Sequence, residues 1–234
     1  MNIQVKKNEH KEVLLMDNTS VNFSICENAS LTLKFIFFSP IKNVMINGEL
    51  KKSAKLKTVV ADFSNGEGKM NAKISLDEEG ANATWDLASL ASKKDKKQFD
   101  ISFIHNKGNT KADMNNYGVA LNASRLVFSG TNHIKKKAKK SNTNQNAKII
   151  VFDKDASGKA NPILRIDEND VLASHAAVVG RLNDEHLFYL KSRGLTEEEA
   201  KALIVSGYLK PIAKNFDNKI QNKINKMIME KCHV

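Results

Sequence analysis

Short runs in which apolar and polar residues alternate recur along most of the chain, and they restrict its fold more than any other feature. They extend from about residue 20 to about residue 172 and follow one another every 10 to 15 residues or so. Clear examples are Leu31/Leu33/Phe35, Met70/Ala72/Ile74/Leu76 and Phe99/Ile101/Phe103. A period of two indicates β-strands that bury one face. The sequence therefore predicts an all-β region.

Turn-forming residues separate these runs, as at Asn47-Gly48, Ser64-Asn65-Gly66 and Ser129-Gly130. Two architectures have such spacing, an antiparallel sandwich and a solenoid of parallel strands. Long helical stretches between the runs are missing, so a doubly wound sheet with helical crossovers is not expected. Periodicity alone leaves the choice between sandwich and solenoid open.

The last quarter of the chain has helical patterns instead. Asn183 is placed to cap a helix that stops at Gly194, and Thr196 with Glu199 has the capping-box form that opens a second helix. We expect the second helix to end near Gly207 and a third to follow Pro211. The predicted organisation is a β-rich part over residues 1–180 and a helical part over residues 181–234.

Composition excludes several classes of protein. The chain has 234 residues, of which 41% are hydrophobic and 27% charged, so it has enough apolar residues for a core. No apolar run reaches the roughly 18 residues of a membrane helix, and the first residues lack a signal-peptide stretch, so a cytoplasmic protein is expected. Cys26 and Cys232 are the only cysteines, which rules out a disulfide framework and a four-cysteine metal site.

The net charge of +11 raises the question of an anionic partner. It comes from 37 basic and 26 acidic residues, but only four of the basic residues are arginines, the usual readers of phosphate and guanine. Lys135–Lys140 holds the densest basic run, and it is either a solvated turn or an anion-binding patch. A polyanion-binding (nucleic-acid-binding) solenoid is therefore kept as an alternative function.

Catalytic motifs are missing from the sequence. It contains no phosphate loop of the form GxxxxGK[ST], no GxGxxG, no HExxH and no GxSxG. A carbohydrate-active β-protein would need a pair of carboxylates across its substrate, and no pair can be selected from sequence. His175 is distinctive because it lies among small apolar residues, and it is either buried with a hydrogen-bond partner or turned to an interface.

The region around His175 resembles a known family. The segments Pro162–Leu182 and Leu187–Leu195, followed by the helix up to Tyr208, are similar to the SufB/SufD family of iron–sulfur cluster assembly proteins, most of all to its SufD side. Upstream, the similar segments are Tyr117-Gly118-Val119, Phe128-Ser129-Gly130 and Asn144-Gln145-Asn146. Before residue 100 only the strand pattern is compatible.

The resemblance implies a right-handed parallel β-helix (solenoid) followed by a small α-helical C-terminal domain. It also implies a non-enzymatic scaffold that pairs with a SufB-like chain, or with a second copy of itself, and docks a SufC-type ABC ATPase on residues 183–208. The docking residues implied by the resemblance are Leu187, Tyr189, Arg193, Leu203 and Tyr208.

The resemblance further assigns His175, next to Ser174, to the pairing interface. There it would be a partial ligand to a transient iron–sulfur cluster shared between two chains, since imidazole is able to bind iron.

Two positions depart from the family: Ala173 stands where many SufD proteins have cysteine, and Asn146 lies near the position of the sulfur-transfer cysteine of SufB. The chain is also short for the family at its N-terminal side. Thiolates supply most cluster ligands, and Cys26 and Cys232 lie near opposite ends of the chain, so it is expected to contribute at most part of a cluster site.

Overall fold

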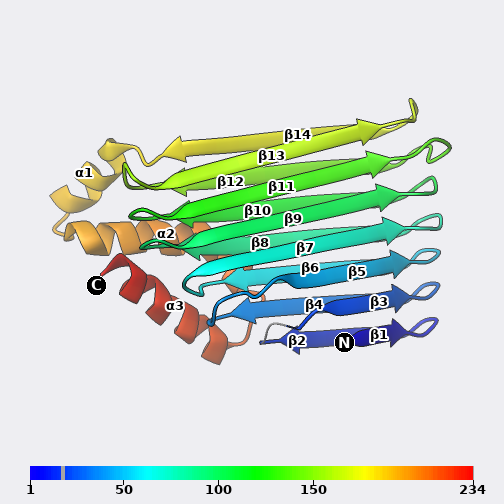
Figure 1. Cartoon of the computed structure of the whole chain (residues 1–234), viewed down its shortest axis with the longest axis horizontal. Coiled ribbons are helices and arrows are strands. Elements are labelled where there is room, and N and C mark those ends of the chain that lie inside the picture. The colour runs from blue at the N-terminus through cyan, green and yellow to red at the C-terminus, as the bar shows by residue number, and fades with distance from the viewer. Residues whose placement is uncertain (17–18, 234) are drawn as a thin grey trace.

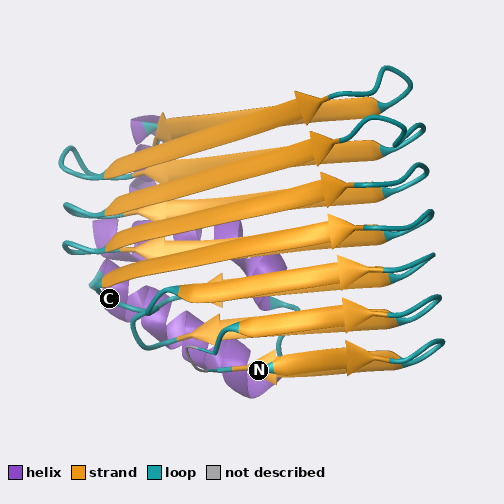
Figure 2. Ribbon diagram, turned by 45° about the vertical axis from the view of Figure 1, so that its right-hand side comes forward, coloured by secondary structure: helices purple, strands orange, loops and turns teal. Residues whose placement is uncertain are grey.

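The chain winds into two parallel sheets that face each other, with helices along one side (Figures 1 and 2). This computed structural model describes residues 1–16 and 19–233, which contain fourteen strands and then three helices. Sheet A holds the odd-numbered strands, β1 (Asn2–Val5), β3 (Val21–Ile25), β5 (Val44–Leu50), β7 (Glu67–Leu76), β9 (Lys96–His105), β11 (Arg125–Ile134) and β13 (Ser157–Ile166). Sheet B holds the even-numbered strands, β2 (His10–Leu15), β4 (Ser30–Phe37), β6 (Lys55–Asp62), β8 (Asn82–Ala91), β10 (Lys111–Ala120), β12 (Asn142–Val151) and β14 (Leu172–Arg181).

Each strand pairs in parallel with the strand two positions away in the chain. Successive turns of the chain therefore stack as rungs, as in the pairing of Phe99 with Phe128 in sheet A and of Trp85 with Met114 in sheet B. The inward side chains of both sheets form one continuous apolar core. The structure is a parallel β-solenoid followed by helices, which confirms the fold implied by the resemblance and excludes the sandwich.

The turns that lead from sheet A to sheet B repeat one backbone feature. Each of them except the last, at residues 167–171, has a residue with positive φ, which asparagine and glycine adopt more readily than other residues. These residues include Asn8, Asn28, Ser53, Gly80 and Asn109. The backbone N–H of four turn residues donates to a carbonyl of the following turn: Asn8 to Glu27, Asn28 to Lys52, Ser53 to Glu79, and Asn109 to Lys139. The turns thus continue the stacking of the strands.

Two of the predicted turns are wrong, since Asn47-Gly48 lies inside β5 and Ser129-Gly130 inside β11. The strands also extend further than the alternation indicated. The structure begins with β1 and β2, before residue 20, and ends with β14, whose small side chains at Ala173, Ala176 and Ala177 give no strong alternation. Residues 172–181 form a strand because they pair in parallel with β12, and not because of their side-chain pattern. The break at residue 180 agrees with the end of β14 at Arg181, but a division of the chain into two domains stays a prediction.

Three helices follow the solenoid, α1 (Asp184–Ser192), α2 (Glu197–Ala213) and α3 (Asn218–Cys232). The predicted caps are confirmed. The Asn183 side chain accepts a hydrogen bond from the N–H of Glu185, and Thr196 forms a complete capping box with Glu199. Gly194, with φ of +93°, ends the turn after α1. Capping of this kind stabilises a helix by about 1 kcal/mol.

The predicted end of the second helix is wrong. α2 does not stop near Gly207 but continues through Pro211 to Ala213, and α3 begins only at Asn218. The continuation buries three more side chains of α2, namely Leu209, Ile212 and Ala213. Their burial at this interface outweighs the hydrogen bond that proline removes in the last turn.

Helices α2 and α3 cover part of the outer face of sheet B. The carboxyl halves of β4, β6, β8 and β10 are buried on both faces, and their outward residues include Ile36, Val59, Ala88, Leu90 and Val119. These residues form a second core with the buried faces of the helices. Among the described residues, no helix is long and apolar enough to cross a membrane.

Gly48 offers a test of the inner packing. The ring of Phe23 lies directly over it, so a Cβ at this position would fall 1.9 Å from the ring atom Cζ. We expect Gly48→Ala to lower the free energy of unfolding by roughly 1 to 3 kcal/mol, because the core must shift to accept the methyl group. Urea unfolding followed by circular dichroism measures this change.

Gly207 is the matched control for that measurement. It lies inside α2, and nothing is within 4 Å of a Cβ placed there. Gly207→Ala should raise the stability by about 0.5 to 1 kcal/mol, since alanine is the better helix former. Equal effects of the two substitutions would contradict the packing of Phe23 on Gly48.

Candidate functional site

The solenoid ends in an open rung. In the part of the chain that the structure describes, no strand follows β13 in sheet A or β14 in sheet B, so both have a free edge (Figure 1). Every residue of β14 is exposed, including Leu172 at 69% and Val178 at 56%. An exposed edge strand presents unpaired N–H and C=O groups that can pair with another chain. This terminal rung is the first candidate site.

The hydrogen bonds of β14 show which of its residues face the free edge. The N–H groups of Leu172 and Leu182 donate to the carbonyls of Ser141 and Val151 in the direction of β12. In a parallel ladder the backbone groups of alternate residues point to opposite neighbours. The backbone groups of the odd-numbered residues, His175 and Ala177 among them, therefore face the free edge.

Pro162 shows that the edge of β13 differs from that of β14. The N–H groups at residues 157 and 167 donate towards β11, so the even-numbered positions of β13 face its free edge. Pro162 occupies one of these positions near the middle of the strand and has no N–H to donate. The free edge of β13 thus lacks a central donor, whereas β14 contains no proline.

His175 is located at the open end of the solenoid interior. It pairs in register with Gln145 of β12, whose side chain is buried between the sheets. Because neighbours in a parallel register share a face, His175 lies on the inward face, and it is exposed since no rung covers it. His175 is therefore exposed rather than buried with a hydrogen-bond partner, and its place at a pairing interface stays a prediction.

Gln145 is a polar residue beneath this rung that the sequence analysis did not select. Its Nε2 donates to the carbonyl of Ile163 at 3.1 Å and so links the two sheets, while its buried Oε1 has no partner. The only sequence feature that points to Gln145 is its place in Asn144-Gln145-Asn146, one of the segments that resemble the family. Ser174, which was selected, lies on the outer face, where its hydroxyl donates to Asn144 at 2.9 Å.

The described residues do not group into a complete metal site. Among residues 1–16 and 19–233, no three His, Cys, Asp or Glu side chains are grouped so that they could hold a metal ion. Cys232 is buried at the end of α3, and burial raises the pKa of its thiol to about 11, which keeps it protonated and unreactive at neutral pH. His175 on its own could supply one ligand of a shared site.

A second candidate surface lies on the helices. Three large apolar side chains are exposed on α1 and α2: Phe188 at 75%, Tyr189 at 56% and Leu203 at 53%. Arg193 stacks over the ring of Tyr189 at 5.2 Å from its centroid. No residue of α1 is fully buried, and Phe188 and Tyr189 are exposed and free to contact another molecule. Phe188, the most exposed, was not among the selected docking residues.

Two of the selected docking residues are less accessible. Leu187 is half-buried, and Tyr208 packs edge-on against Tyr117 of β10 with ring centroids 5.7 Å apart. Burial raises the pKa of the Tyr208 hydroxyl, so this residue stays neutral. Tyr208 therefore also joins α2 to sheet B. The accessible part of the surface consists of Phe188, Tyr189, Arg193 and Leu203, which we call the helical patch.

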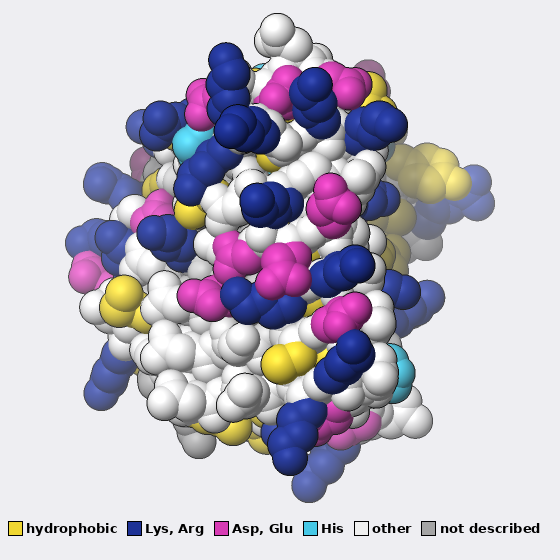
Figure 3. Space-filling view, turned by 90° about the vertical axis from the view of Figure 1, so that its right-hand side faces the viewer, with side chains coloured by type: hydrophobic (Ala, Val, Ile, Leu, Met, Phe, Trp, Pro, Cys, Tyr) yellow, Lys and Arg dark blue, Asp and Glu magenta, His cyan; other side chains and the backbone are white. Residues whose placement is uncertain are grey.

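The basic run occupies the turn between β11 and β12. Lys137 donates its backbone N–H to the carboxylate of Glu168 at 2.9 Å, and this bond is the largest cause that lowers the pKa of Glu168. Lys140 donates its backbone N–H to the carbonyl of Asp170. Figure 3 looks onto this side of the molecule, where basic and acidic side chains are mixed. The run thus lies beside acidic residues of the next turn.

Comparison with known proteins matches most of the chain to one family. Residues 4–208 match the model of the family described as "SUF system FeS cluster assembly, SufBD core domain". The iron–sulfur cluster assembly protein SufD of Bacillus subtilis is 29% identical over 202 residues, which are 86% of this chain and 45% of that protein.

Relatives from staphylococci match a shorter stretch. SufBD family proteins of iron–sulfur cluster assembly from Staphylococcus epidermidis and Staphylococcus haemolyticus are each 27% identical over 150 residues, or 64% of this chain and 32% of theirs. The chain thus matches less than half the length of these curated relatives.

The family match covers almost all of the solenoid and reaches the end of the helical patch. It agrees with the resemblance seen in the sequence, and it extends that resemblance into the first hundred residues, where the sequence showed only a compatible strand pattern. The chain belongs to the SufBD core family of the SUF system of iron–sulfur cluster assembly.

Proposed function

We propose that this chain is a non-enzymatic, SufD-like scaffold subunit of an iron–sulfur cluster assembly complex. It pairs through its terminal rung with a SufB-like chain or with a second copy of itself, and it docks a SufC-type ATPase on the helical patch. The observation that carries the proposal is the open terminal rung, where a free β14 edge and His175 lie together. The cytoplasmic location expected from the sequence stays a prediction.

Pairing at the edge of β14 is supported by backbone chemistry. A second strand placed along β14 would satisfy the unpaired N–H and C=O groups and cover the apolar side chains of Leu172, Val178 and Val179. The edge of β13 is the poorer one because Pro162 removes a donor. We therefore place the main strand contact along β14.

The cluster is the cargo of such a pair rather than a resident cofactor of this chain. His175 at the open end would contribute one imidazole ligand, and the paired chain would contribute the thiolates that this rung lacks. The role of this chain would be to hold part of a nascent cluster through that coordinate bond, without catalysing a reaction itself.

Docking of the ATPase is supported by the accessible apolar side chains of the helical patch. Phe188 and Leu203 are more than half exposed. Burying a side chain of this size contributes about 1.5 to 3 kcal/mol. Helix α2 also packs on sheet B, so a partner bound to the patch would be fixed relative to the solenoid.

The polyanion-binding alternative gains no specific support from the structure. The acidic residues beside Lys135–Lys140 weaken the local positive potential, and no aromatic side chains accompany the lysines. This alternative stays a prediction from charge alone.

Ala177→Pro tests the pairing edge. The N–H of Ala177 faces the free edge, so proline should leave the pairing of β14 with β12 intact and remove a donor from the new contact. We expect a folded chain whose dissociation constant for its paired chain rises at least about tenfold, a loss of roughly 1.4 kcal/mol. Size-exclusion chromatography with light scattering measures it, for the chain alone and mixed with a SufB-like protein.

Ala177→Ser is the matched control, because serine retains the backbone donor at the same position. It should pair as the unchanged chain does. If Ala177→Pro paired equally well, or if the unchanged chain paired with neither protein, the proposed role of β14 would be wrong.

Phe188→Ser combined with Leu203→Ser tests the docking surface. Both side chains are exposed, so the substitutions should leave folding intact and abolish co-elution with a SufC-type ATPase in high salt, where contacts due only to the +11 charge are screened. Met45→Ser provides the control, since Met45 is 48% exposed on the outer face of sheet A. Undiminished binding by the double variant would exclude the helical patch as the docking site.

His175→Ala tests the ligand role. The side chain is exposed and no hydrogen bond holds it in place, so folding and pairing should be unchanged while the yield of clusters on the assembled complex falls several-fold. Iron and sulfide are quantified on the purified complex. An unchanged yield in a complex that still pairs would remove His175 from the cluster site.

A further inference from the structure

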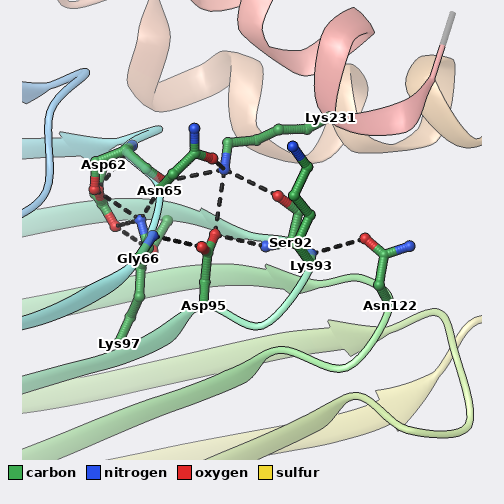
Figure 4. Close-up of polar contacts among 11 residues, drawn as sticks. Asp62, Asn65, Gly66, Ser92, Lys93, Asp95, Lys97, Asn122 and Lys231 are labelled. Atoms are coloured by element: carbon green, nitrogen blue, oxygen red, sulfur yellow. Dashed lines mark hydrogen bonds and ion pairs between the residues drawn. The ribbon is translucent and has the colours of Figure 1, made fainter.

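Four charged side chains are buried where the last helix meets the solenoid (Figure 4). Asp62 and Lys97 are at most 1% exposed, and Asp95 and Lys231 are 4% exposed. Burying a charge is unfavourable unless it is paired and hydrogen-bonded, so such a group is rarely incidental. Neither of the functions proposed above uses these residues.

One half of the cluster belongs to the solenoid alone. Lys97 of β9 lies 2.7 Å from the carboxylate of Asp62 in β6 and also donates to Ser64. The same carboxylate accepts bonds from the hydroxyls of Ser64 and Ser89. This half ties sheet A to sheet B inside the solenoid.

The other half joins α3 to the solenoid. Lys231, in the last turn of α3, is more than 130 residues away in sequence from every residue that its ammonium contacts. Its Nζ contacts four oxygen atoms on two turns: Ser64 O at 3.0 Å, Asn65 Oδ1 at 2.7 Å, Ser92 Oγ at 3.0 Å and Asp95 Oδ2 at 3.3 Å. The carbonyl oxygen of Ser64 accepts from both lysines, which joins the two halves.

The remaining contacts of α3 are less specific. Its apolar face contributes Ile220, Ile224 and Ile228 to the second core, and Lys223 lies over the ring of Phe38. Apolar contacts are not directional, whereas the ammonium of Lys231 shares its three N–H donors among four oxygen atoms and so gives the end of the helix directed contacts. Lys231 therefore determines where α3 is placed on sheet B.

We propose that Lys231 is a lock that holds α3 on the solenoid, and that α3 detaches as a unit from a folded solenoid when this lock is opened. Residues 214–217 connect α3 to α2 and would serve as the hinge. Asp95 keeps bonds from the N–H groups of Gly66 and Ser92 without Lys231, so the solenoid side of the lock stays satisfied after release.

The hydrogen bonds of Lys231 are opposed by the cost of burying its charge. Burial, and then the neighbouring charge of Lys97, lower the pKa of Lys231, against the opposing effect of Asp95. The charged lysine is therefore less favourable here than in water, despite its contacts with four oxygen atoms. A contact of this kind gives a precise position without making α3 as stable as the core strands.

The lock also has a consequence for assembly, which rests on the proposed function. The turn that contains Ser92 and Asp95 is connected by hydrogen bonds to the next two turns on this side of the solenoid. The N–H of Lys93 donates to Asn122 Oδ1, and the N–H of Asn122 donates to Asp153 Oδ2, in the turn that leads into the terminal rung. A displacement of the helices by a docked ATPase would thus act on turns that connect to the pairing edge.

Hydrogen exchange of the complete chain, followed by mass spectrometry, tests the lock. Lys231→Met retains the apolar stem of the side chain and removes its ammonium. We expect amides of α3 to exchange at least tenfold faster, while those of β8 and β10 are unchanged. Lys226→Met is the matched control, because Lys226 lies on the same helix with a 76% exposed side chain and only one distant ion-pair partner, Glu230 at 3.9 Å.

Unchanged exchange of α3 in Lys231→Met would overturn the proposal, because the apolar face alone would then hold the helix. Should this variant fail to fold, the unchanged chain is measured in increasing urea below its unfolding transition. The proposal requires α3 to exchange through an opening that costs less free energy than unfolding of β8 and β10, and exchange only by global unfolding would overturn it. No partner is involved, so these results are independent of pairing and docking.

Discussion

The stacking of parallel rungs is the constraint on which the rest of this structure depends. Each strand satisfies its backbone groups on the strands of the preceding and following rungs, and the positive-φ turns at Asn28, Ser53 and Asn109 repeat the pattern outside the sheets. Such a ladder has no internal means of closing, because the last rung has nothing above it. The free edge of β14 and the exposed His175 are therefore a consequence of the architecture rather than a local irregularity.

The helices cover an apolar outer face that the stacked strands of sheet B leave open to solvent. The outer face of sheet B is apolar over the carboxyl halves of β6 and β8, and it needs a cover. Apolar side chains on α2 and α3 supply it, and burial at this interface is strong enough to carry α2 past Gly207 and Pro211. The cover leaves Phe188 and Leu203 outward, so one helical segment both completes the fold and offers a surface.

Much of this was accessible from the sequence because the signals are local. Alternation revealed the central strands, and Asn183 and Thr196 revealed where helices begin. What was missed depends on contacts between distant residues. Nothing in the sequence separates Lys97 and Lys231 from the other lysines of a basic chain, and only the fold shows that both are buried beside aspartates. Gln145 was not predicted for the same reason, since only the register between β12 and β14 places it beneath His175.

The side chains of the terminal rung are of the kind that limits unspecific pairing at a free strand edge. A long, flat, strongly apolar edge would recruit any exposed strand, and proteins avoid this with small, polar or proline residues. Here Pro162 weakens one edge, and on the other the small residues Ala173, Ser174 and Ala177 separate the exposed apolar side chains of Leu172, Val178 and Val179. The rung thus contains backbone groups to pair and one imidazole, but no thiolate. A cluster could be completed there only by the chain that pairs with it.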